Sequence, residues 1–233
     1  MMASIAPSNT YDDRRQRLET YFDRTASKTW ERLTSDAPVS GIRATVRAGR
    51  DRMRAMLLSW LPDDLTGLRL LDAGCGTGSL SVEAARRGAE VVAIDVAGSL
   101  VDVARDRTPD ALNIDWRVGD MLDPALGRFD HVVAMDSLIH YRSADIADAV
   151  TRLAERTDGS LLFTFAPSSA PLEIMHKVGK LFPRGDRAPA IEPVREATLR
   201  RLLPNRLGRC ERISSGFYKS QALEVFPGEV LPR

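Results

Sequence analysis

The chain has 233 residues, of which 43% are hydrophobic and 28% charged, a composition typical of a globular protein with one large core. Its 33 Lys and Arg residues balance 32 Asp and Glu residues, so a formal charge of +1 excludes the basic field typical of nucleic-acid-binding proteins. Two cysteines, Cys75 and Cys210, are too few for a disulfide framework or a metal-ligand cluster, which predicts a reducing, cytoplasmic location.

The N-terminal part of the chain has helical periodicity. In residues 11–60, apolar side chains recur every three or four positions, which predicts two helical segments. The stretch "LPDDLTG" (61–67) then ends the pattern with a proline and a glycine. We expect residues 1–62 to form an N-terminal helical cap or lid.

Residues 68–165 follow a different pattern, in which short apolar strands alternate with amphipathic helices. The predicted strands are 68–74, 90–96, 113–120, 129–137 and 159–167, and the predicted helices are 79–87, 98–107 and 144–156. This alternation is typical of an α/β protein with a parallel sheet and helices on both faces.

The C-terminal part adds one helix and two strands. Residues 192–203 have helical spacing, and the runs 206–214 and 216–226 are close enough in sequence to pair as an antiparallel hairpin at the sheet edge. We therefore assign residues 63–233 to one core domain. Within it, the segment 166–191 lies outside the sheet pattern and is expected to cover the cleft as an insertion.

A glycine-rich loop, "DAGCGTGS" (72–79), follows the first predicted strand. In such sheets, ligands bind at the carboxyl ends of the strands, where the strand order reverses. A dinucleotide-binding loop has the spacing G-x-G-x-x-G, but Ser79 occupies the third glycine position here. Gly74, Gly76 and Gly78 instead let the backbone approach a ligand with a ribose and an amino-acid portion, whose carboxylate meets amides at the helix N-terminus. This spacing predicts S-adenosylmethionine.

Two acidic residues support the same ligand. Asp95 ends the second strand, about 20 residues after the loop, where its carboxylate can accept hydrogen bonds from both ribose hydroxyls. Asp120 follows the third strand and can accept from the adenine amino group, with Met121 against the ring. A tight turn with two solvated caps is the alternative, but the loop and both acids together favour a nucleoside site.

Residues 68–165 resemble the class I S-adenosylmethionine-dependent methyltransferases. The motifs "LLDAGCGTG", "AIDV", "VGDM" and "FDHVVAMDSLIHY" stand in the order and spacing of that family. The resemblance implies a Rossmann-like, seven-stranded, mostly parallel sheet with its last strand inserted antiparallel, in agreement with the C-terminal hairpin. It leaves the acceptor open, because this fold hosts many acceptors.

The stretch "MDSLIHY" follows the fourth strand, at the rim that faces the donor methyl group. Asp136 and His140 lie four residues apart, so both can reach one site if a helical turn follows the strand. For His140 we favour a functional role over a local backbone contact. Three roles are open: orienting the acceptor, which we favour, removing its proton, or ligating a metal carried by the acceptor.

The second helical segment carries an arginine stripe at positions 43, 47, 50 and 54. Such a stripe is usually a solvated helix face, although one or two members can pair with a carboxylate. Tyr21, Phe22 and Trp30 lie on the first helical segment, which would cover the cleft. Aromatic residues at this spacing more often belong to a core than to a substrate platform.

A second resemblance covers nearly the whole chain. The stretches "YFDRTASKTWERL", "VRAGRD", "LPDDLTG", "DAGCGTGSLSVEAARRGAEV", "MDSLIHY" and "LFPRGDRAP" look like the magnesium-protoporphyrin IX methyltransferase family of bacteriochlorophyll biosynthesis. The resemblance implies an O-methyltransferase that converts a propionate carboxylate of magnesium-protoporphyrin IX to its methyl ester. Chlorophyll-forming relatives carry a tyrosine just after the Trp-x-Arg stretch, where this chain has Leu33 and Thr34. A catalytic role for that tyrosine is therefore not transferred.

The residues and the resemblance together give a predicted site, without a metal bound by the protein because the substrate carries the magnesium. The catalytic candidates are His140, Asp136 and Tyr21. The candidates for binding the acceptor are Trp30, Arg43, Arg47 and Tyr141. The candidates for binding S-adenosylmethionine are Asp72, Ala73, Gly74, Cys75, Gly76, Gly78, Asp95, Val96, Asp120, Met121 and Met135.

The chain is not expected to span a membrane. No apolar stretch approaches the roughly 20 residues of a membrane helix, and "MMASIAPSNTYDDRRQ" lacks the apolar core of a signal peptide. The amphipathic segment 166–187 packs over the cleft in the interpretation that we favour, and peripheral association with the photosynthetic membrane is the alternative. The resemblance also implies transfer of the porphyrin from the porphyrin-binding subunit of magnesium chelatase.

Three alternative functions stay open. An NAD-linked oxidoreductase would share the sheet and the acid after the second strand, but this loop lacks its third glycine. A non-catalytic, donor-binding partner would keep the loop, although His140 and the aromatic first helix argue against it. A methyltransferase that acts on another small carboxylate or hydroxyl acceptor is the third alternative.

Overall fold

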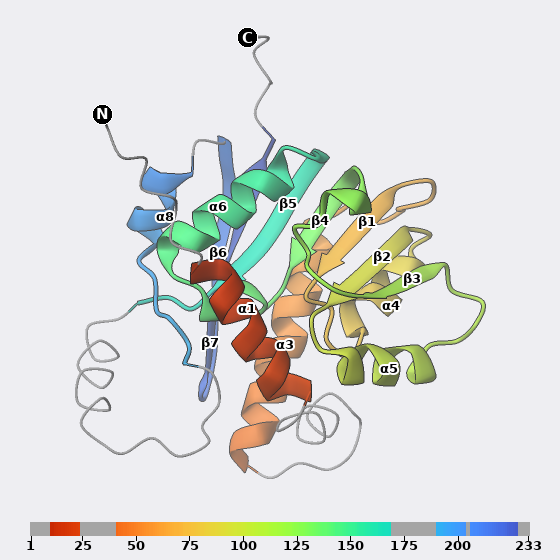
Figure 1. Ribbon diagram of the computed structural model, residues 1–233, viewed down its shortest axis with the longest axis horizontal. Helices are drawn as coiled ribbons and strands as arrows, with labels where there is room; N and C mark the ends of the chain where they lie inside the picture. The colour runs from red at the N-terminus through yellow and green to blue at the C-terminus, as the bar shows by residue number, and fades with distance from the viewer. Residues whose placement is uncertain (1–9, 24–40, 169–189, 204–205, 228–233) are drawn as a thin grey trace, which may run out of the picture.

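A computed structural model describes residues 10–23, 41–168, 190–203 and 206–227 (Figure 1). These residues form a seven-stranded sheet with the strand order β3-β2-β1-β4-β5-β7-β6. Strands β1 to β5 are parallel, and β7 runs antiparallel to both of its neighbours, β5 and β6. The strands are β1 (Arg69–Ala73), β2 (Glu90–Asp95), β3 (Ile114–Val118), β4 (Phe129–Ala134), β5 (Thr157–Phe165), β6 (Arg206–Ser215) and β7 (Tyr218–Phe226).

The inner strands are apolar on both sides because helices cover both faces of the sheet. The runs "LLDA" in β1, "VVAI" in β2 and "LLFTF" in β5 are buried throughout. The edge strand β3 keeps no fully buried residue, and most of β6 is also open to solvent. The predicted α/β class, the seven strands and the antiparallel C-terminal hairpin are confirmed.

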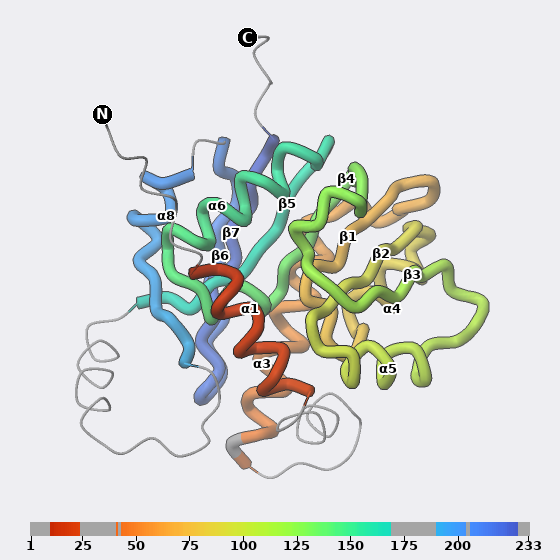
Figure 2. The backbone as a smooth tube through the Cα atoms, in the orientation of Figure 1, coloured from red at the N-terminus to blue at the C-terminus, as the bar shows by residue number. Residues whose placement is uncertain are grey.

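Two helical layers enclose the sheet. Leu18 of α1 packs in one apolar cluster with α6 and α8, whereas Met53 and Leu57 of α3 pack with α4 in a second cluster. Figures 1 and 2 show α1 and α6 in front of the sheet and α3 behind it. The helices are α1 (Thr10–Tyr21), α3 (Gly41–Ser59), α4 (Ser79–Arg86), α5 (Gly98–Arg107), α6 (Ser143–Ala154) and α8 (Glu196–Leu202), with short 3-10 turns η2 (Pro124–Leu126) and η3 (Leu138–His140).

Helix α3, in the N-terminal part of the chain, packs against the C-terminal hairpin. A β-carbon added to Gly49 would lie 2.5 Å from Cδ1 of Tyr218, so helix and strand are in direct contact. Ser215 Oγ, at the end of β6, donates to the carbonyl oxygen of Thr45 at 2.9 Å. Met53, Leu57 and Leu58 of this helix are buried in the core. The second half of the predicted cap therefore also contributes to the core of the sheet domain.

The last helix begins later than its spacing predicts. Instead of covering 192–203, α8 starts at Glu196, and Val194 forms a parallel bridge with Pro167. Val194 N donates to Ala166 O at 2.8 Å, and Pro193 disfavours a helical conformation for the residue before it. The tertiary contact with the end of β5 thus overrides the helical periodicity. Residues 169–189, most of the predicted insertion, lie outside the described residues.

Within the parts of the chain that the structure describes, no helix combines the length and the apolar character needed to cross a membrane.

Candidate active site

The loop between β1 and α4 has a backbone that favours glycine. Gly74, Gly76 and Gly78 have φ angles of 88°, 53° and 79°, in the left-handed region. A β-carbon on Gly74 would lie 2.3 Å from Cβ of Ser137, and one on Gly78 would lie 2.3 Å from Cη2 of Trp116. The conformation therefore favours glycine at all three positions, and close packing also requires it at Gly74 and Gly78. The backbone itself forms part of the site.

Asp95 closes this loop from the end of β2. One carboxylate oxygen accepts from Gly76 N at 2.9 Å, and the other accepts from Ala97 N at 3.0 Å. Burial raises the pKa of Asp95, while these backbone hydrogen bonds oppose the shift. A carboxylate has about four lone-pair sites, so two acceptor positions are available for the two hydroxyls of a ribose.

Asp72 lies beneath the loop with only 1% of its surface exposed. Ser81 Oγ donates to its carboxylate at 2.5 Å. Burial raises the pKa of Asp72 to about 7, and the negative charge of Asp95 adds to the shift. Burial also raises the pKa of the Cys75 thiol well above its usual value, which disfavours the nucleophilic thiolate form.

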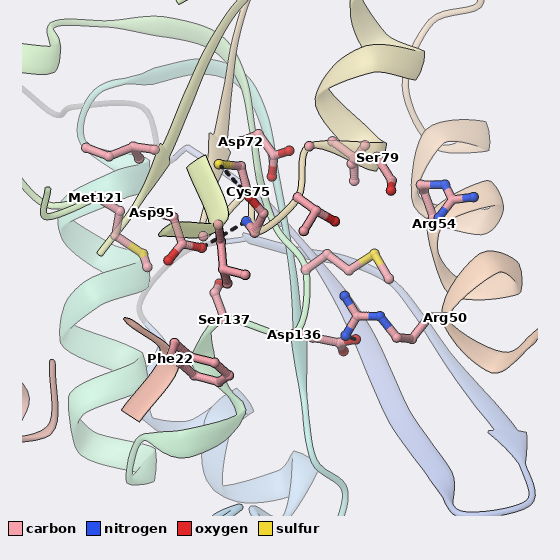
Figure 3. A pocket seen from close by; sticks show the side chains of 18 of the residues that line it. Phe22, Arg50, Arg54, Asp72, Cys75, Ser79, Asp95, Met121, Asp136 and Ser137 are labelled. Carbon is pink, nitrogen blue, oxygen red and sulfur yellow. Dashed lines mark hydrogen bonds and ion pairs between the residues drawn. The ribbon is translucent and has the colours of Figure 1, made fainter. Parts of the chain in front are cut away.

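A cavity of about 450 Å³ opens at the carboxyl ends of the central strands. Its volume falls in the range of small-molecule sites. In Figure 3, Asp95 and Met121 lie on one side of the cavity, and Arg50 and Asp136 lie on the other. The predicted residues that line it are Asp72, Gly74, Cys75, Gly76, Gly78, Asp95, Val96, Met121, Met135, Asp136, His140, Tyr141 and Arg47.

Four predicted site residues within the described chain are not part of this lining. Ala73 is buried in the sheet, and Arg43 is exposed on α3. Tyr21 packs edge-on against Phe22, and it is Phe22 that reaches the cavity. Trp30 lies outside the described residues. The fourth residue outside the lining is Asp120, the acid after β3, which the first helix α1 contacts.

That acid, Asp120, contacts α1. Tyr11 donates its hydroxyl to Oδ1 of Asp120 at 2.8 Å, and Leu122 N donates to the same oxygen at 2.9 Å. The second oxygen lies 3.7 Å from Nε of Arg15. The ring of Tyr11 stacks on Tyr141 with centroids 4.9 Å apart, and burial raises the pKa of both phenols. An adenine amino group would therefore meet an Asp120 that α1 already engages.

Asp136 has an unusual backbone and a crowded carboxylate. Its φ of 55° is the single positive value for a non-glycine residue in the described chain. Arg50 Nη1 donates to Oδ2 at 2.9 Å, and Tyr218 donates its hydroxyl to Oδ1 at 3.1 Å. Ser220 and Thr164 each donate to Oδ1 at 3.2 Å. The side chain is 4% exposed, so α3, β5 and β7 all fix this carboxylate.

His140 is the last residue of η3, where the short helical turn brings it to the same cavity as Asp136. Its Nδ1 lies 3.4 Å from Ala190 O, and its ring stands edge-on to Phe22 with centroids 6.2 Å apart. Arg14 donates to the backbone carbonyl of His140. Phe22, just after α1, and Ala190, before α8, therefore contact the imidazole, and Arg14 of α1 holds the backbone of His140.

Sequence reasoning missed several residues of the site. Ser137 stands inside the motif "MDSLIHY" but carries no signal of its own, because its closeness to Gly74 depends on the strand pairing. Arg50 belongs to the arginine stripe, and only the fold shows that it faces the cavity. Tyr11 precedes every recognisable motif. Among the described residues, no group of three or more His, Cys, Asp or Glu side chains is arranged to hold a metal ion.

The strand order, the glycine loop and the acid at the end of β2 together indicate one class of protein. A family model described as a methyltransferase domain matches residues 70–158, which contain the loop and both acids. The fold and this site define a class I S-adenosylmethionine-dependent methyltransferase.

A second family model, described as the magnesium-protoporphyrin IX methyltransferase C-terminus, matches residues 134–227, and with the relatives below it shows that the chain belongs to the magnesium-protoporphyrin O-methyltransferase family. The magnesium-protoporphyrin O-methyltransferase of Rhodobacter capsulatus is 52% identical over 93% of this chain and 98% of the relative. That of Synechocystis is 31% identical over 88% and 93%. A crystal structure of Synechocystis magnesium protoporphyrin IX methyltransferase with bound SAH superposes with a TM-score of 0.81 at 28% identity, covering 91% of this chain and 99% of that one.

Proposed function

We propose that the protein transfers the methyl group of S-adenosylmethionine to a propionate carboxylate of magnesium-protoporphyrin IX, in bacteriochlorophyll biosynthesis. The products are the monomethyl ester and S-adenosylhomocysteine. The observation that carries the proposal is a single cavity that joins the glycine loop and Asp95 to His140. Membership of the magnesium-protoporphyrin O-methyltransferase family supports the choice of acceptor.

The reaction requires alignment more than proton removal. A propionic acid has a pKa close to that of Glu, about 4.3, so at neutral pH it is already a carboxylate nucleophile. One carboxylate oxygen attacks the methyl carbon, the C–S bond breaks, and its electron pair stays on sulfur. An anion and a sulfonium cation thus become a neutral ester and a neutral thioether. Holding the reactants in line can supply roughly 7 to 11 kcal/mol of the barrier.

In this proposal, different residues bind the ribose, the amino-acid portion and the adenine of S-adenosylmethionine. The carboxylate of Asp95 accepts from the ribose hydroxyls with the lone pairs that Gly76 and Ala97 leave open. The backbone of the glycine loop meets the amino-acid portion, with its carboxylate at the N-terminus of α4. Met121 and Val96, on the cavity wall, contact the adenine. The adenine amino group is assigned to Asp120, the neighbour of Met121, although Asp120 is not itself part of the cavity wall and already bonds to Tyr11.

The acceptor residues lie at the opposite side of the cavity. We assign His140 the task of orienting the reacting propionate, supported by its place on the cavity wall beside Phe22. The proposed acceptor side is completed by further residues predicted from the sequence: Tyr141, Arg47, Tyr21, Trp30 and Arg43. The macrocycle carries its own magnesium, so the protein supplies shape and charge.

The proposed organisation has residues 1–62 as a cap over a core of residues 63–233, with 166–191 as an insertion that covers the cleft. The placement of Phe22 and Leu18 on the cavity wall supports the cap, although α3 also belongs to the core. We further propose a cytoplasmic protein that receives its porphyrin from magnesium chelatase. Peripheral association with the photosynthetic membrane is the alternative to a segment 166–187 that only packs over the cleft. A vesicle flotation assay tests the membrane contact.

A turnover assay tests the function. Purified protein is incubated with S-adenosylmethionine and magnesium-protoporphyrin IX, and the methyl ester is followed chromatographically, with metal-free protoporphyrin IX in parallel. Ester formed from the magnesium porphyrin supports donor, acceptor and reaction together. Tight binding of S-adenosylmethionine without ester from either porphyrin would overturn the acceptor while keeping the methyltransferase class.

A further inference from the structure

The Asp136 carboxylate is filled by hydrogen bonds from within the protein. A carboxylate has about four lone-pair sites. One hydrogen bond each comes from Arg50 of α3, Thr164 of β5, and Ser220 and Tyr218 of β7. A substrate proton would have to displace one of them. This arrangement fits a group that holds its neighbour in place rather than one that exchanges protons.

The neighbour that Asp136 holds in the cavity is Arg50. Its side chain is 23% exposed, lines the cavity, and donates to Oδ2 of Asp136 at 2.9 Å. This ion pair through Nη1 restricts the direction of the guanidinium group, and a planar guanidinium fork suits a carboxylate ligand. Arg47, one turn earlier and also on the cavity wall, adds positive charge to balance a second anion.

The position of Arg50 relates it to the acceptor rather than to the nucleoside. Asp95 and Met121 mark the nucleoside side of the cavity, and Arg50 and Asp136 lie across from them (Figure 3). Asp136 begins the segment that ends in His140, the residue proposed to orient the reacting group. The donor's own carboxylate is assigned to the N-terminus of α4.

We propose that Arg50 binds a carboxylate of the acceptor, and that Asp136 and Tyr218 are positioning residues that fix its guanidinium group. This inference rests on the proposed function and names the residue that distinguishes a propionate acid from its ester. Asp136 holds the guanidinium group from the buried side, and the acceptor carboxylate approaches it from the cavity that Arg50 lines. Such a site is specific for a carboxylate-bearing acceptor.

The test compares two porphyrins that differ only in their carboxylates. Dissociation constants of magnesium-protoporphyrin IX and of its dimethyl ester are measured by fluorescence titration of the full chain with S-adenosylhomocysteine bound. Arg50→Gln is expected to weaken binding of the diacid about tenfold or more, the scale of one hydrogen bond between charged groups. Binding of the diester and of S-adenosylhomocysteine is expected to change less than about twofold.

Two further variants separate positioning and net charge from direct contact. Tyr218→Phe removes one donor to Asp136 without changing charge and is expected to weaken binding of the diacid less than Arg50→Gln does. In the Arg50→Gln background, Tyr218→Phe is expected to have no further effect on diacid binding, because Tyr218 acts through the guanidinium group of Arg50. Arg52→Gln removes the same charge from an exposed position of α3 and is expected to leave the diacid-to-diester ratio unchanged.

The outcomes distinguish this inference from the proposed function. Equal weakening of diacid and diester in Arg50→Gln would make its role structural and overturn the inference. Weaker binding of S-adenosylhomocysteine alone would assign Arg50 to the carboxylate of the donor and would also overturn the inference. Failure of the unmodified protein to bind either porphyrin, with S-adenosylhomocysteine still bound, would instead overturn the proposed acceptor.

Discussion

The hydroxyl of Tyr11 donates to Oδ1 of Asp120 at 2.8 Å and so fastens the first helix to the loop after β3. Gly119 and Met121, on either side of Asp120, both line the cavity. The first helix is therefore attached directly beside the place where the adenine is expected. In the proposed donor site, the Asp120 carboxylate would serve both the adenine and the docking of the first helix.

Tyr11→Phe is expected to weaken binding of S-adenosylhomocysteine about fivefold, because α1 loses a hydrogen bond to a charged group where it covers the adenine end. Isothermal titration calorimetry measures the change. Thr20→Val is the matched control, since the Thr20 hydroxyl donates to Gln16 O within the same helix and is exposed. Unchanged affinity in Tyr11→Phe would contradict a role for α1 in retaining the donor.

Asp95→Asn is expected to weaken S-adenosylmethionine binding by about tenfold to a hundredfold, with a smaller effect on kcat. The amide loses acceptor capacity that the ribose hydroxyls need, because Gly76 N and Ala97 N already use one site on each oxygen. Calorimetric titration with S-adenosylhomocysteine gives the affinity. Asp115→Asn, on the exposed strand β3, is the control, and equal affinities in both variants would remove Asp95 from the donor site.

His140→Ala is expected to lower kcat about a hundredfold while the affinity for S-adenosylhomocysteine stays within about twofold. The reason is that the imidazole lies on the acceptor side of the cavity. His140→Asn can still donate a hydrogen bond, so partial recovery of kcat indicates an orienting role, and no recovery indicates a base. His131→Gln is the control, because His131 pairs with Ser160 within the sheet. Unchanged turnover in His140→Ala would exclude the residue from the mechanism.

Asp72→Asn is expected to stabilise the ligand-free protein above pH 7. The native pKa of Asp72 is about 7 and exceeds the unfolded value of about 3.9, so the native state binds the extra proton between these limits. The stability of the unmodified protein then falls as pH rises from about 4 to about 7. The asparagine variant lacks this loss.

Urea unfolding at pH 5 and pH 8 measures the Asp72 effect. The difference in free energy of unfolding between Asp72→Asn and the unmodified protein should be larger at pH 8, by an amount of order 1 to 3 kcal/mol. Asp63→Asn, at an exposed position near the start of the core, is the control for loss of one carboxylate. A difference that shrinks with rising pH would contradict the assigned protonation of Asp72.

Local patterns predicted the donor half of this molecule well. Alternating apolar runs indicated the parallel strands, and the spacing of Gly74, Gly76 and Gly78 indicated the loop, because both signals depend on neighbours in sequence. The start of α8 was predicted wrongly, since a bridge between Val194 and Pro167 outweighs helical spacing.

The surroundings of Asp136 could not be predicted in this way. Tyr218 and Ser220 alternate along β7 and therefore share one face of the sheet. The register that pairs Thr164 with Ala222 brings that face to the end of β4. A register is set by the whole sheet, so no local motif reports that a carboxylate 82 residues earlier in the chain lies there.

The contact between Gly49 and Tyr218 gives a residue without any functional group a part in selectivity. Gly49 precedes Arg50, and the ring that fills the space above its Cα belongs to the tyrosine whose hydroxyl bonds Asp136. Any larger residue at position 49 must push helix and strand apart. A neutral-looking change remote from the chemistry would then alter which porphyrins the protein accepts, so natural variation at this position is expected to be as restricted as in the glycine loop.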